Sequence, residues 1–591
     1  MINLDYPFDF ELINKKHRSI KRELLDTKKS FLDKKIAILG GSTTSGIKDM
    51  LELFLLNYGI RPEIYESEFG QYWQDAMFDG ALQSFKPDII FIHTTSRNLT
   101  QYPAIQNTPQ EIDDKIENQF FHWKQMWDKL AETIHCPIIQ NNFDRPQYRL
   151  LGNKDISDIH GKTNFIMRLN QKFYEYAQAH NDFYINDIDY LAASFGLDKW
   201  HDPHFWYLYK YALCVPAIPE FAFNVANIIK AIYGKNKKAF VLDLDNTLWG
   251  GVVGDDGINN LEIGNETAVG QAYLEFQDYI KAHKDLGIIL TIASKNDYEN
   301  AIAGLNHPDS SLHSDDFIVI KANWENKDKN IKEISEILNI GQDSLVFVDD
   351  NPVERDLVRS QINDIAAAEI GQPDSYIRII DKSGFFEVLK LSQDDINRNK
   401  MYKENVQRTQ SEQSFDNYRD FLLSLDMKAG ISSFESIYIQ RIAQLTNKSN
   451  QFNLTTKRYT ESDIETIAKS KNHINLYGRL SDKFGDNGLV SVIIGRKENK
   501  ILHIELWIMS CRVLKRDMEF AMLDALIEEC KKQGIENILG YYYPTSKNKM
   551  VKEFYAILGF SKINENDNGD TVWEYKVEKH KRKNTVIKIE K

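Results

Sequence analysis

One stretch near the middle of the chain decides how the rest is interpreted: Lys238-Ala239-Phe240-Val241-Leu242-Asp243-Leu244-Asp245-Asn246-Thr247-Leu248-Trp249-Gly250-Gly251. Asp243 follows a strand-like apolar run without a turn signal, which predicts a buried strand whose carboxyl end carries two aspartates. Open α/β sheets place their sites at that edge. One carboxylate of such a pair can attack phosphorus while the other handles the proton of the leaving oxygen. On its own, the pair could equally be an exposed Asp-x-Asp at a strand end.

Later segments supply the other groups that such a reaction needs. An apolar run ends in Ser294, Lys327 precedes a helical pattern, and a further apolar run ends in Asp349 and Asp350. The order of acid pair, hydroxyl, lysine and acid pair is what Mg²⁺-assisted phosphoryl transfer requires. It provides a carboxylate nucleophile, oxygens for the cation, and donors for the phosphoryl oxygens.

These residues resemble the haloacid dehalogenase superfamily of aspartyl phosphotransferases and, more closely, the FkbH-like family, also called subfamily IIIC. The resemblance is carried by the segments 242–252, 347–355 and 444–456. It implies Asp243 as nucleophile, Asp245 as acid and base, Thr247 and Ser294 as phosphoryl contacts, and Lys327 as the neutralising charge. The implied ligands of Mg²⁺ are Asp243, Asp245, Asp349 and Asp350. The expected contacts to the substrate are Asn246, Lys295, Asn296, Asn351 and Arg512.

Length and composition limit the classes of protein to consider. A chain of 591 residues is too long for one hydrophobic core, so several domains are expected. With 73 basic and 86 acidic residues the net charge is −13, which gives no global attraction to nucleic acid or an anionic membrane. The cysteines Cys136, Cys214, Cys511 and Cys530 show neither ligand spacing nor a disulfide framework, which favours a reducing cytoplasm. No secretory segment is evident, and no run approaches the roughly eighteen apolar residues of a membrane span.

The first third alternates strand-like and helical segments, which predicts a parallel, doubly wound sheet. Gly40-Gly41-Ser42-Thr43 follows the first strand and opens a helix, where Ser42 could act as a nucleophile or a cap. With Asn98 and a terminal Asp-x-x-His, this layout resembles the SGNH hydrolases. The first block is not Gly-Asp-Ser, and the base could be His201 or His204. We therefore expect a retained scaffold or carrier-docking fold rather than a working esterase.

The central domain leaves little room above its predicted site. Only 51 positions separate Asp243 from Ser294, of which 250–264 are expected to form a hairpin flap and 267–284 a return helix. No folded cap fits in that space. An uncapped site admits large substrates, such as a group held on a carrier protein, more readily than a capped one.

The last third is predicted as alternating strands and helices and resembles the N-acetyltransferase-like (GNAT) fold. The resemblance rests on Asn548 and on the ending Phe554-Tyr555-Ala556-Ile557-Leu558-Gly559-Phe560. Lys515 and Asp517 stand where the pyrophosphate cradle of that fold has glycines. Binding of acetyl-CoA is therefore in doubt, and a pantetheine-bearing carrier is a comparable candidate.

Cys511 ends a predicted strand of this part, beside Arg512. A cation and a helix N-terminus would lower the pKa of its thiol and make it a thioester-forming nucleophile, whereas the competing interpretation is a small buried hydrophobic residue. The stretch 447–456, rich in amides and hydroxyls, is expected to be a substrate-binding or interdomain loop. The tail 581–591 is basic at its start and is expected to be solvated.

The sequence thus predicts a multidomain α/β protein. Two doubly wound parallel sheets, SGNH-like in 1–235 and Rossmannoid without a large cap in 236–400, precede an α+β GNAT-like domain in 401–580. The role implied by the FkbH resemblance is a Mg²⁺-dependent phosphotransferase that makes a glyceryl thioester on the phosphopantetheine arm of an acyl carrier protein. Its phosphorylated small-molecule donor would be 1,3-bisphosphoglycerate. The alternatives are a phosphatase acting on a phosphorylated glycan, capsule or lipid precursor, and a carrier-binding scaffold with inactive flanking domains.

Overall fold

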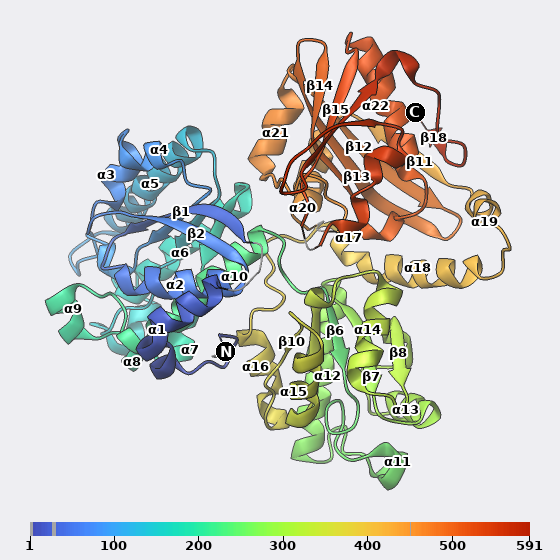
Figure 1. Cartoon of the computed structure of the whole chain (residues 1–591). Helices are drawn as coiled ribbons and strands as arrows, with labels where there is room; N and C mark the ends of the chain where they lie inside the picture. Colours follow the sequence, from blue (N-terminus) through green and yellow to red (C-terminus); the bar gives the residue numbers. More distant parts are fainter. Residues whose placement is uncertain (1–3, 27–30, 449–450, 546, 591) are drawn as a thin grey trace. The chain divides into compact units, whose positions relative to one another are not determined.

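The computed structural model describes residues 4–26, 31–448, 451–545 and 547–590 (Figure 1). Contacts divide the chain into two compact units, the first built mainly from Phe8–Ile232 and the second mainly from Tyr233–Tyr459 and Ile464–Lys591. The boundary predicted at residue 400 lies within the helix α18 (Arg398–Glu412), inside the second unit.

A five-stranded parallel sheet forms the centre of the first unit, in the order β2-β1-β3-β4-β5. Its strands are β1 (Leu32–Gly40), β2 (Ile60–Glu66), β3 (Ile89–His93), β4 (Ile138–Asn141) and β5 (Phe183–Asn186). The edge strand β2 was missed, because Arg61, Pro62 and Glu63 interrupt its apolar pattern. A proline and charges of this kind are tolerated only at the edge of a sheet.

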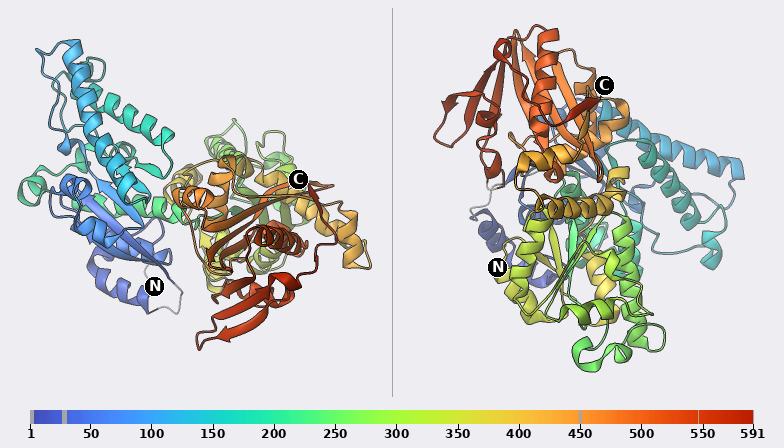
Figure 2. Two further views of the ribbon diagram at one scale, coloured as in Figure 1. Left: turned by 90° about the horizontal axis from the view of Figure 1, so that it is seen from above. Right: turned by 90° about the vertical axis from the view of Figure 1, so that its right-hand side faces the viewer.

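Helices cover both faces of this sheet (Figure 1, Figure 2). The helices on one face are α2 (Ser45–Asn57) and α10 (Ile218–Ile232), and those on the other are α5 (Pro109–Thr133) and α6 (Lys162–Ala179). Phe91 of β3 contacts Phe221 of α10, whereas Ile90 packs with Trp127 and Phe173 on the opposite face. The alternation of strand residues therefore buries both faces, as in other covered parallel sheets.

Among the described residues, one helical stretch is long and apolar enough to cross a membrane: Val215–Ile232, with a mean hydropathy of 1.2. This stretch was not recognised from the sequence. Of its residues, 67% are buried inside the molecule, as expected for a helix that packs on a sheet.

The second unit contains another five-stranded parallel sheet, in the order β10-β9-β6-β7-β8. Its strands are β6 (Ala239–Leu242), β7 (Ile289–Ser294), β8 (Val319–Ala322), β9 (Leu345–Val348) and β10 (Ala366–Ala367). The central strand β6 packs on α12 (Ala268–Asp285) through Phe240 and on α14 (Lys327–Leu338) through Val241. Because all five strands are parallel, their carboxyl ends meet at one edge. The predicted fold class, a multidomain α/β protein with two parallel sheets, is confirmed.

The segment between β6 and α12 differs from the predicted two-stranded hairpin. A single antiparallel bridge joins Gly250 to Glu262, and the loop between them holds the short helices α11 (Val253–Asp256) and η4 (Ile258–Asn260). The return helix begins as predicted, where the Thr267 hydroxyl accepts a hydrogen bond from the Gly270 N–H at 2.9 Å.

An eight-stranded sheet forms the last part of the second unit, in the order β16-β17-β15-β14-β13-β12-β11-β18. Its strands are β11 (Lys428–Ser432), β12 (His473–Asp482), β13 (Gly485–Glu498), β14 (Ile501–Met509), β15 (Asn537–Tyr542), β16 (Ser561–Glu565), β17 (Thr571–Lys576) and β18 (Lys588–Glu590). The strands β14 and β15 pair in parallel as far as Ile504 and Gly540, after which no ladder between them continues within the described residues. The helix expected over 549–558 is split into η10 (Lys549–Val551) and α23 (Phe554–Ile557).

The tail expected to be solvated is instead part of this sheet. Strand β18 pairs in parallel with β11, and Ile587 is only 4% exposed. The carboxylate of Asp524, on α22 (Met518–Lys532), accepts hydrogen bonds from the N–H groups of Lys583 and Asn584. The prediction was wrong because the basic start of the tail hid the apolar residues that follow it.

Candidate active site

Three carboxylates gather at the carboxyl edge of the second parallel sheet. Asp243 follows β6, and Asp349 and Asp350 follow the neighbouring strand β9. The register of the two strands pairs Leu242 with Val348, so the acids that follow them are brought together. One oxygen from each of the three carboxylates lies within 4.8 Å of the others.

Lys327, the first residue of α14, holds two of these acids. Its Nζ lies 2.8 Å from Oδ2 of Asp243 and 2.6 Å from Oδ2 of Asp349. The lysine side chain is 5% exposed. Burial lowers its pKa, but the two carboxylates outweigh burial and raise the pKa above its ordinary value, so the ammonium stays charged.

The cluster of three carboxylates and Lys327 carries a net negative charge. Burial and the neighbouring Asp243 raise the pKa of Asp349 to about 6 and also raise that of Asp350. Three carboxylates and one ammonium leave two negative charges in the cluster. Carboxylate oxygens are the ligands that Mg²⁺ prefers, so the donors and the charge both fit a divalent cation.

Asp245, which is also predicted as a metal ligand, is not one of the three acids whose oxygens gather within 4.8 Å. Its Oδ1 accepts hydrogen bonds from Nε1 of Trp249 at 2.9 Å and from the Val253 N–H at 3.1 Å. Its Oδ2 accepts one from Nδ2 of Asn296 at 3.0 Å. Burial raises the pKa of Asp245. Trp249 and Asn296 therefore fix the position of this second acid from two sides.

The two predicted hydroxyls also lie at this edge. Thr247 is fully buried, and its Oγ1 accepts a hydrogen bond from the Asp350 N–H at 3.2 Å. Ser294 is the last residue of β7, next to β6 in the sheet, and is 2% exposed. Thr247 therefore stands in the turn that follows Asp243 and Asp245, and Ser294 ends the neighbouring strand at the same edge.

Three of the expected substrate contacts have local partners in the chain. Asn246 has a φ of 57°, and its Oδ1 accepts a hydrogen bond from the Gly251 N–H at 3.0 Å. Asn351 caps the helix α15 (Pro352–Gln361), accepting from the Val353 N–H at 3.0 Å. Lys295 pairs with Glu354 through a distance of 2.6 Å between Nζ and Oε1. These side chains shape the loops around the site.

Arg355 was not recognised as part of the site. Its guanidinium donates to the backbone carbonyls of Asp349 and Asp350 at 2.7 and 2.9 Å, and the residue is 6% exposed. It fixes the main chain that presents both acids. Its place five residues beyond Asp350, in the first turn of a helix, was the available signal.

The structure does not bring Cys511 to the acid cluster. Cys511 starts the turn η9 (Cys511–Val513) beyond the end of β14, and its Sγ lies 3.8 Å from the Tyr402 hydroxyl. Its carbonyl accepts a hydrogen bond from Asn339, the residue that follows α14. Lys327 stands at the other end of that helix of 12 residues, which is ~18 Å long. Arg512 is also buried, with its Nε 3.2 Å from the Ser510 hydroxyl. The interpretation of Cys511 as a small packed residue is therefore favoured.

Of the predicted hydrolase residues of the first unit, Ser42 and His201 are buried, Asn98 is half-buried, and His204 is exposed. Nδ2 of Asn98 donates to the Gly41 carbonyl at 2.9 Å. His201 has its Nε2 3.6 Å from Oδ2 of the buried Asp144, whereas Asp198 is exposed. Among the described residues, neither Oγ of Ser42 nor Nδ1 of His201 has a hydrogen-bond partner, so the two do not bond to each other. An assembled pair of nucleophile and base is not formed.

Part of the amide-rich stretch 447–456 fills the space where β14 and β15 separate. The Met509 N–H donates to the Phe452 carbonyl at 3.3 Å on the β14 side, and the Tyr543 N–H donates to the Leu454 carbonyl at 2.9 Å beyond β15. The Thr455 hydroxyl donates to the Glu505 carbonyl at 2.7 Å. Phe452–Thr455 is thus a buried piece of the sheet rather than a loop open to substrate; Asn450 lies outside the described residues.

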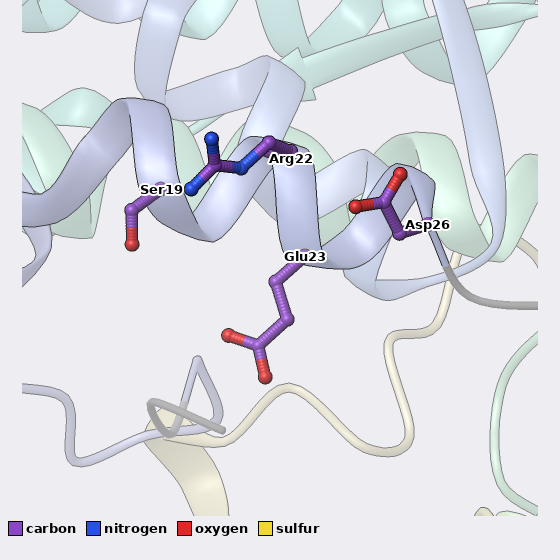
Figure 3. Close-up of a pocket in the computed structure, with 4 residues that line it drawn as sticks. All are labelled: Ser19, Arg22, Glu23 and Asp26. Atoms are coloured by element: carbon purple, nitrogen blue, oxygen red, sulfur yellow. The ribbon is translucent and has the colours of Figure 1, made fainter.

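A shallow hollow lies on the first unit (Figure 3). Its lining consists of Ser19, Arg22, Glu23 and Asp26, which come from the helix α1 (Phe10–Leu25) and its C-cap. It contains no predicted site residue, and we assign no function to it.

Comparisons with known proteins agree with the central site. Residues 35–230 match a family model described as FkbH, N-terminal domain, and residues 238–367 match one described as NLI interacting factor-like phosphatase. A solved N-terminal part of a Bacteroides fragilis protein, containing a phosphatase domain complexed with Mg, is 28% identical. That match covers 64% of this chain and 99% of the solved one, with a TM-score of 0.59. No curated protein matches the chain.

Acetyltransferase structures match a quarter of the chain, with low similarity. The ribosomal-protein-S18-alanine N-acetyltransferase of Escherichia coli and Ard1 of Thermoplasma volcanium are 14% and 16% identical, with TM-scores of 0.20. Each covers 25% of this chain, and the matches span 94% and 97% of the solved chains. TM-scores this low do not assign this chain to the acetyltransferases. The comparisons therefore support an enzyme of the haloacid dehalogenase phosphatase type in the central part, and a first part like the N-terminal domain of FkbH.

Proposed function

We propose that the chain is a Mg²⁺-dependent phosphatase that works through an aspartyl-phosphate at Asp243. The observation that carries the proposal is the buried cluster in which Lys327 bridges Asp243 and Asp349 while two negative charges remain unbalanced. Asp243, Asp349 and Asp350 would hold Mg²⁺, which when bound supplies positive charge to the phosphoryl oxygens.

The protein groups account for each bond in the reaction. A carboxylate oxygen of Asp243 attacks phosphorus, and the bond from phosphorus to the leaving oxygen breaks. Asp245, held by Trp249 and Asn296, gives that oxygen a proton. Water then attacks the phosphorus of the aspartyl-phosphate, Asp245 accepts a proton from it, and inorganic phosphate leaves as Asp243 is restored. Lys327 and the hydroxyls of Thr247 and Ser294 stabilise the phosphoryl oxygens.

The test is turnover of acetyl phosphate with Mg²⁺, combined with mass spectrometry of the acid-quenched protein. We expect a phosphorylated species in the wild type, and we expect Asp243→Asn to lose both that species and turnover by several orders of magnitude. Ser294→Ala removes one donor and should cost about 10²- to 10³-fold. Asp356→Asn, which changes a carboxylate that is 79% exposed, is the matched control. Unchanged turnover in Asp243→Asn would overturn the assignment.

A finer proposal, which rests on the FkbH resemblance, is glyceryl transfer from 1,3-bisphosphoglycerate to an acyl carrier protein. The thiolate of the phosphopantetheine arm would attack the acyl carbon, the carbon–oxygen bond to phosphate would break, and the remaining phosphate ester would be hydrolysed at Asp243. Because Cys511 packs against Tyr402 far from Asp243, we propose direct transfer to the arm. Burial raises the thiol pKa of Cys136 and Cys530, which makes them poor alternatives.

Mass spectrometry of the carrier protein tests this finer proposal. A glyceryl adduct on the carrier that persists in Cys511→Ala supports direct transfer, whereas loss of the adduct in that variant restores the cysteine relay. Absence of any adduct, with phosphatase activity intact, favours the phosphorylated glycan, capsule or lipid precursor. The arrangement of Trp324, described next, also favours that second candidate.

A further inference from the structure

Exposed apolar side chains occur in the segments that follow the strands of the second parallel sheet. Each of the four segments after β6, β7, β8 and β9 has at least one at its start, and these are Val252 (37% exposed), Tyr298 (56%), Trp324 (72%) and Val353 (71%). Loops at the carboxyl edge of an open parallel sheet are where ligands bind. The apolar rim therefore lies where the part of a substrate beyond its phosphate would rest.

Trp324 is the most distinctive member of this rim. The chain has nine tryptophans, all of them among the described residues, and the other eight are buried or half-buried. Its Nε1 donates to Oδ1 of Asp297 at 2.9 Å. This hydrogen bond fixes the indole beside the start of α13 (Tyr298–Leu305), where Tyr298 stands. An exposed indole held in one orientation offers a large, rigid face on which an apolar surface can pack.

Two short segments of the chain link this ring to the reacting groups. Asp297 follows Asn296, whose side chain bonds to Oδ2 of Asp245. In the other direction, Trp324 stands three residues before Lys327, whose Nζ touches Asp243. The loop is held over the sheet by the Asn323 N–H, which donates to the Ser294 carbonyl at 3.1 Å. The segments that hold the indole therefore also hold Lys327, which contacts Asp243, and Asn296, which contacts Asp245.

We infer that Trp324, together with Tyr298, is a platform for the leaving group of the phosphate ester, and that this leaving group contains a ring with an apolar face. The inference rests on the proposed phosphatase function and specifies its substrate class. A sugar ring or an aromatic ring offers such a face to an indole, whereas a three-carbon hydroxylated chain does not. The platform therefore favours a phosphorylated ring compound over a glyceryl donor.

The test compares three phosphate monoesters on the full chain with Mg²⁺: 4-nitrophenyl phosphate, glucose 1-phosphate and glycerol 3-phosphate. For Trp324→Ala we expect KM to rise about tenfold for a ring substrate, the worth of one aromatic contact, with kcat nearly unchanged. KM for glycerol 3-phosphate should change less than about twofold, because that substrate has no ring to lose contact with. Trp324→Phe should restore most of the affinity. A KM effect on 4-nitrophenyl phosphate alone assigns the platform to aromatic groups, and one on glucose 1-phosphate assigns it to sugars.

Two further variants separate a platform from a general effect. Asp297→Ala removes the hydrogen bond that orients the indole. It should raise KM for the ring substrates and leave KM for glycerol 3-phosphate unchanged. Ile337→Ala, which removes a side chain that is 41% exposed near the far end of α14, is the control and should change none of the three. Equal losses on all three substrates, or no change on any, would overturn the inference. Either result leaves the Asp243 assignment to its own test, because Asp243→Asn reports on the chemistry and Trp324→Ala on the leaving group.

Discussion

Replacing Lys327 by methionine should have opposite effects on metal binding and on turnover. The lysine Nζ lies 2.8 and 2.6 Å from two carboxylates of the cluster, whose oxygens lie within 4.8 Å of one another. A cation bound by those oxygens would therefore be roughly 5 Å from the ammonium. At an effective dielectric constant of about 20, unit charges at that distance interact by about 3 kcal/mol, and a divalent ion by up to about twice that.

The lysine consequently weakens the binding of the ion that it sits beside. Half of the interaction worked out for unit charges, about 1.5 kcal/mol, already corresponds to a factor of about ten in Mg²⁺ affinity. We expect Lys327→Met to bind Mg²⁺ at least about tenfold more tightly than the wild type. Turnover of acetyl phosphate should fall about 10²- to 10³-fold, because a charge that stabilises the transition state is lost. Without Mg²⁺ the variant should lose about 3–5 kcal/mol of stability, because its buried carboxylates lose their partner.

Calorimetric titration with Mg²⁺ and thermal unfolding across a range of Mg²⁺ concentrations measure the two equilibrium effects. The midpoint of unfolding should rise more steeply with Mg²⁺ in the variant than in the wild type. Lys295→Met is the matched control, since Lys295 pairs with Glu354 and is 34% exposed, and we expect little change there. Weaker Mg²⁺ binding in Lys327→Met, or full activity, would refute the reasoning.

Three further predictions concern the flanking parts of the chain. Ser42→Ala should leave hydrolysis of short acyl esters by the full chain unchanged, because Ser42 has no hydrogen-bonded base; a serine-dependent rate would show otherwise. Free acetyl-CoA should give no binding heat in calorimetry, since Phe452–Thr455 fills the space between the diverging strands, and micromolar binding would contradict this. Ile587→Ala should lower the free energy of unfolding by about 2–4 kcal/mol, measured in urea, whereas a solvated tail would give no change.

The sequence was sufficient to predict that both sheets are parallel and to predict the order of the acids, but not the edge strands β2, β8 and β10. Strands such as β6 and β9 are buried on both faces, so they appear as uninterrupted apolar runs. The acids stand immediately after those runs, and neighbouring parallel strands must end at the same edge. The cluster of Asp243, Asp349 and Asp350 follows from these two facts without knowledge of any side-chain conformation.

The roles of single polar residues could not be predicted in the same way. Asn246 and Asn351 have the composition of substrate contacts, but their side chains bond to the main chain a few residues on. Asparagine is favoured both in sites and in tight turns, so its presence does not separate the two roles. The surroundings of Cys511 could not be predicted for a different reason, since a turn beyond the strand end places its Sγ near the Tyr402 hydroxyl. This last contact joins segments that are 109 residues apart in sequence, and no local pattern reveals it.

The last part of the second unit shows why a motif at a strand end does not determine function. Its diverging strands could in principle receive an extended arm, because they leave N–H and C=O groups between them. Here Phe452 and Leu454 of the chain itself are buried in that space, and each contributes about 1.5–3 kcal/mol through burial. A ligand that displaced this segment would first have to compensate for about 3–6 kcal/mol of lost burial free energy. It would also have to replace the hydrogen bonds that the segment makes with the strands. The inserted segment is therefore a permanent part of the core, and the chemistry of this chain is best sought at the Asp243 edge.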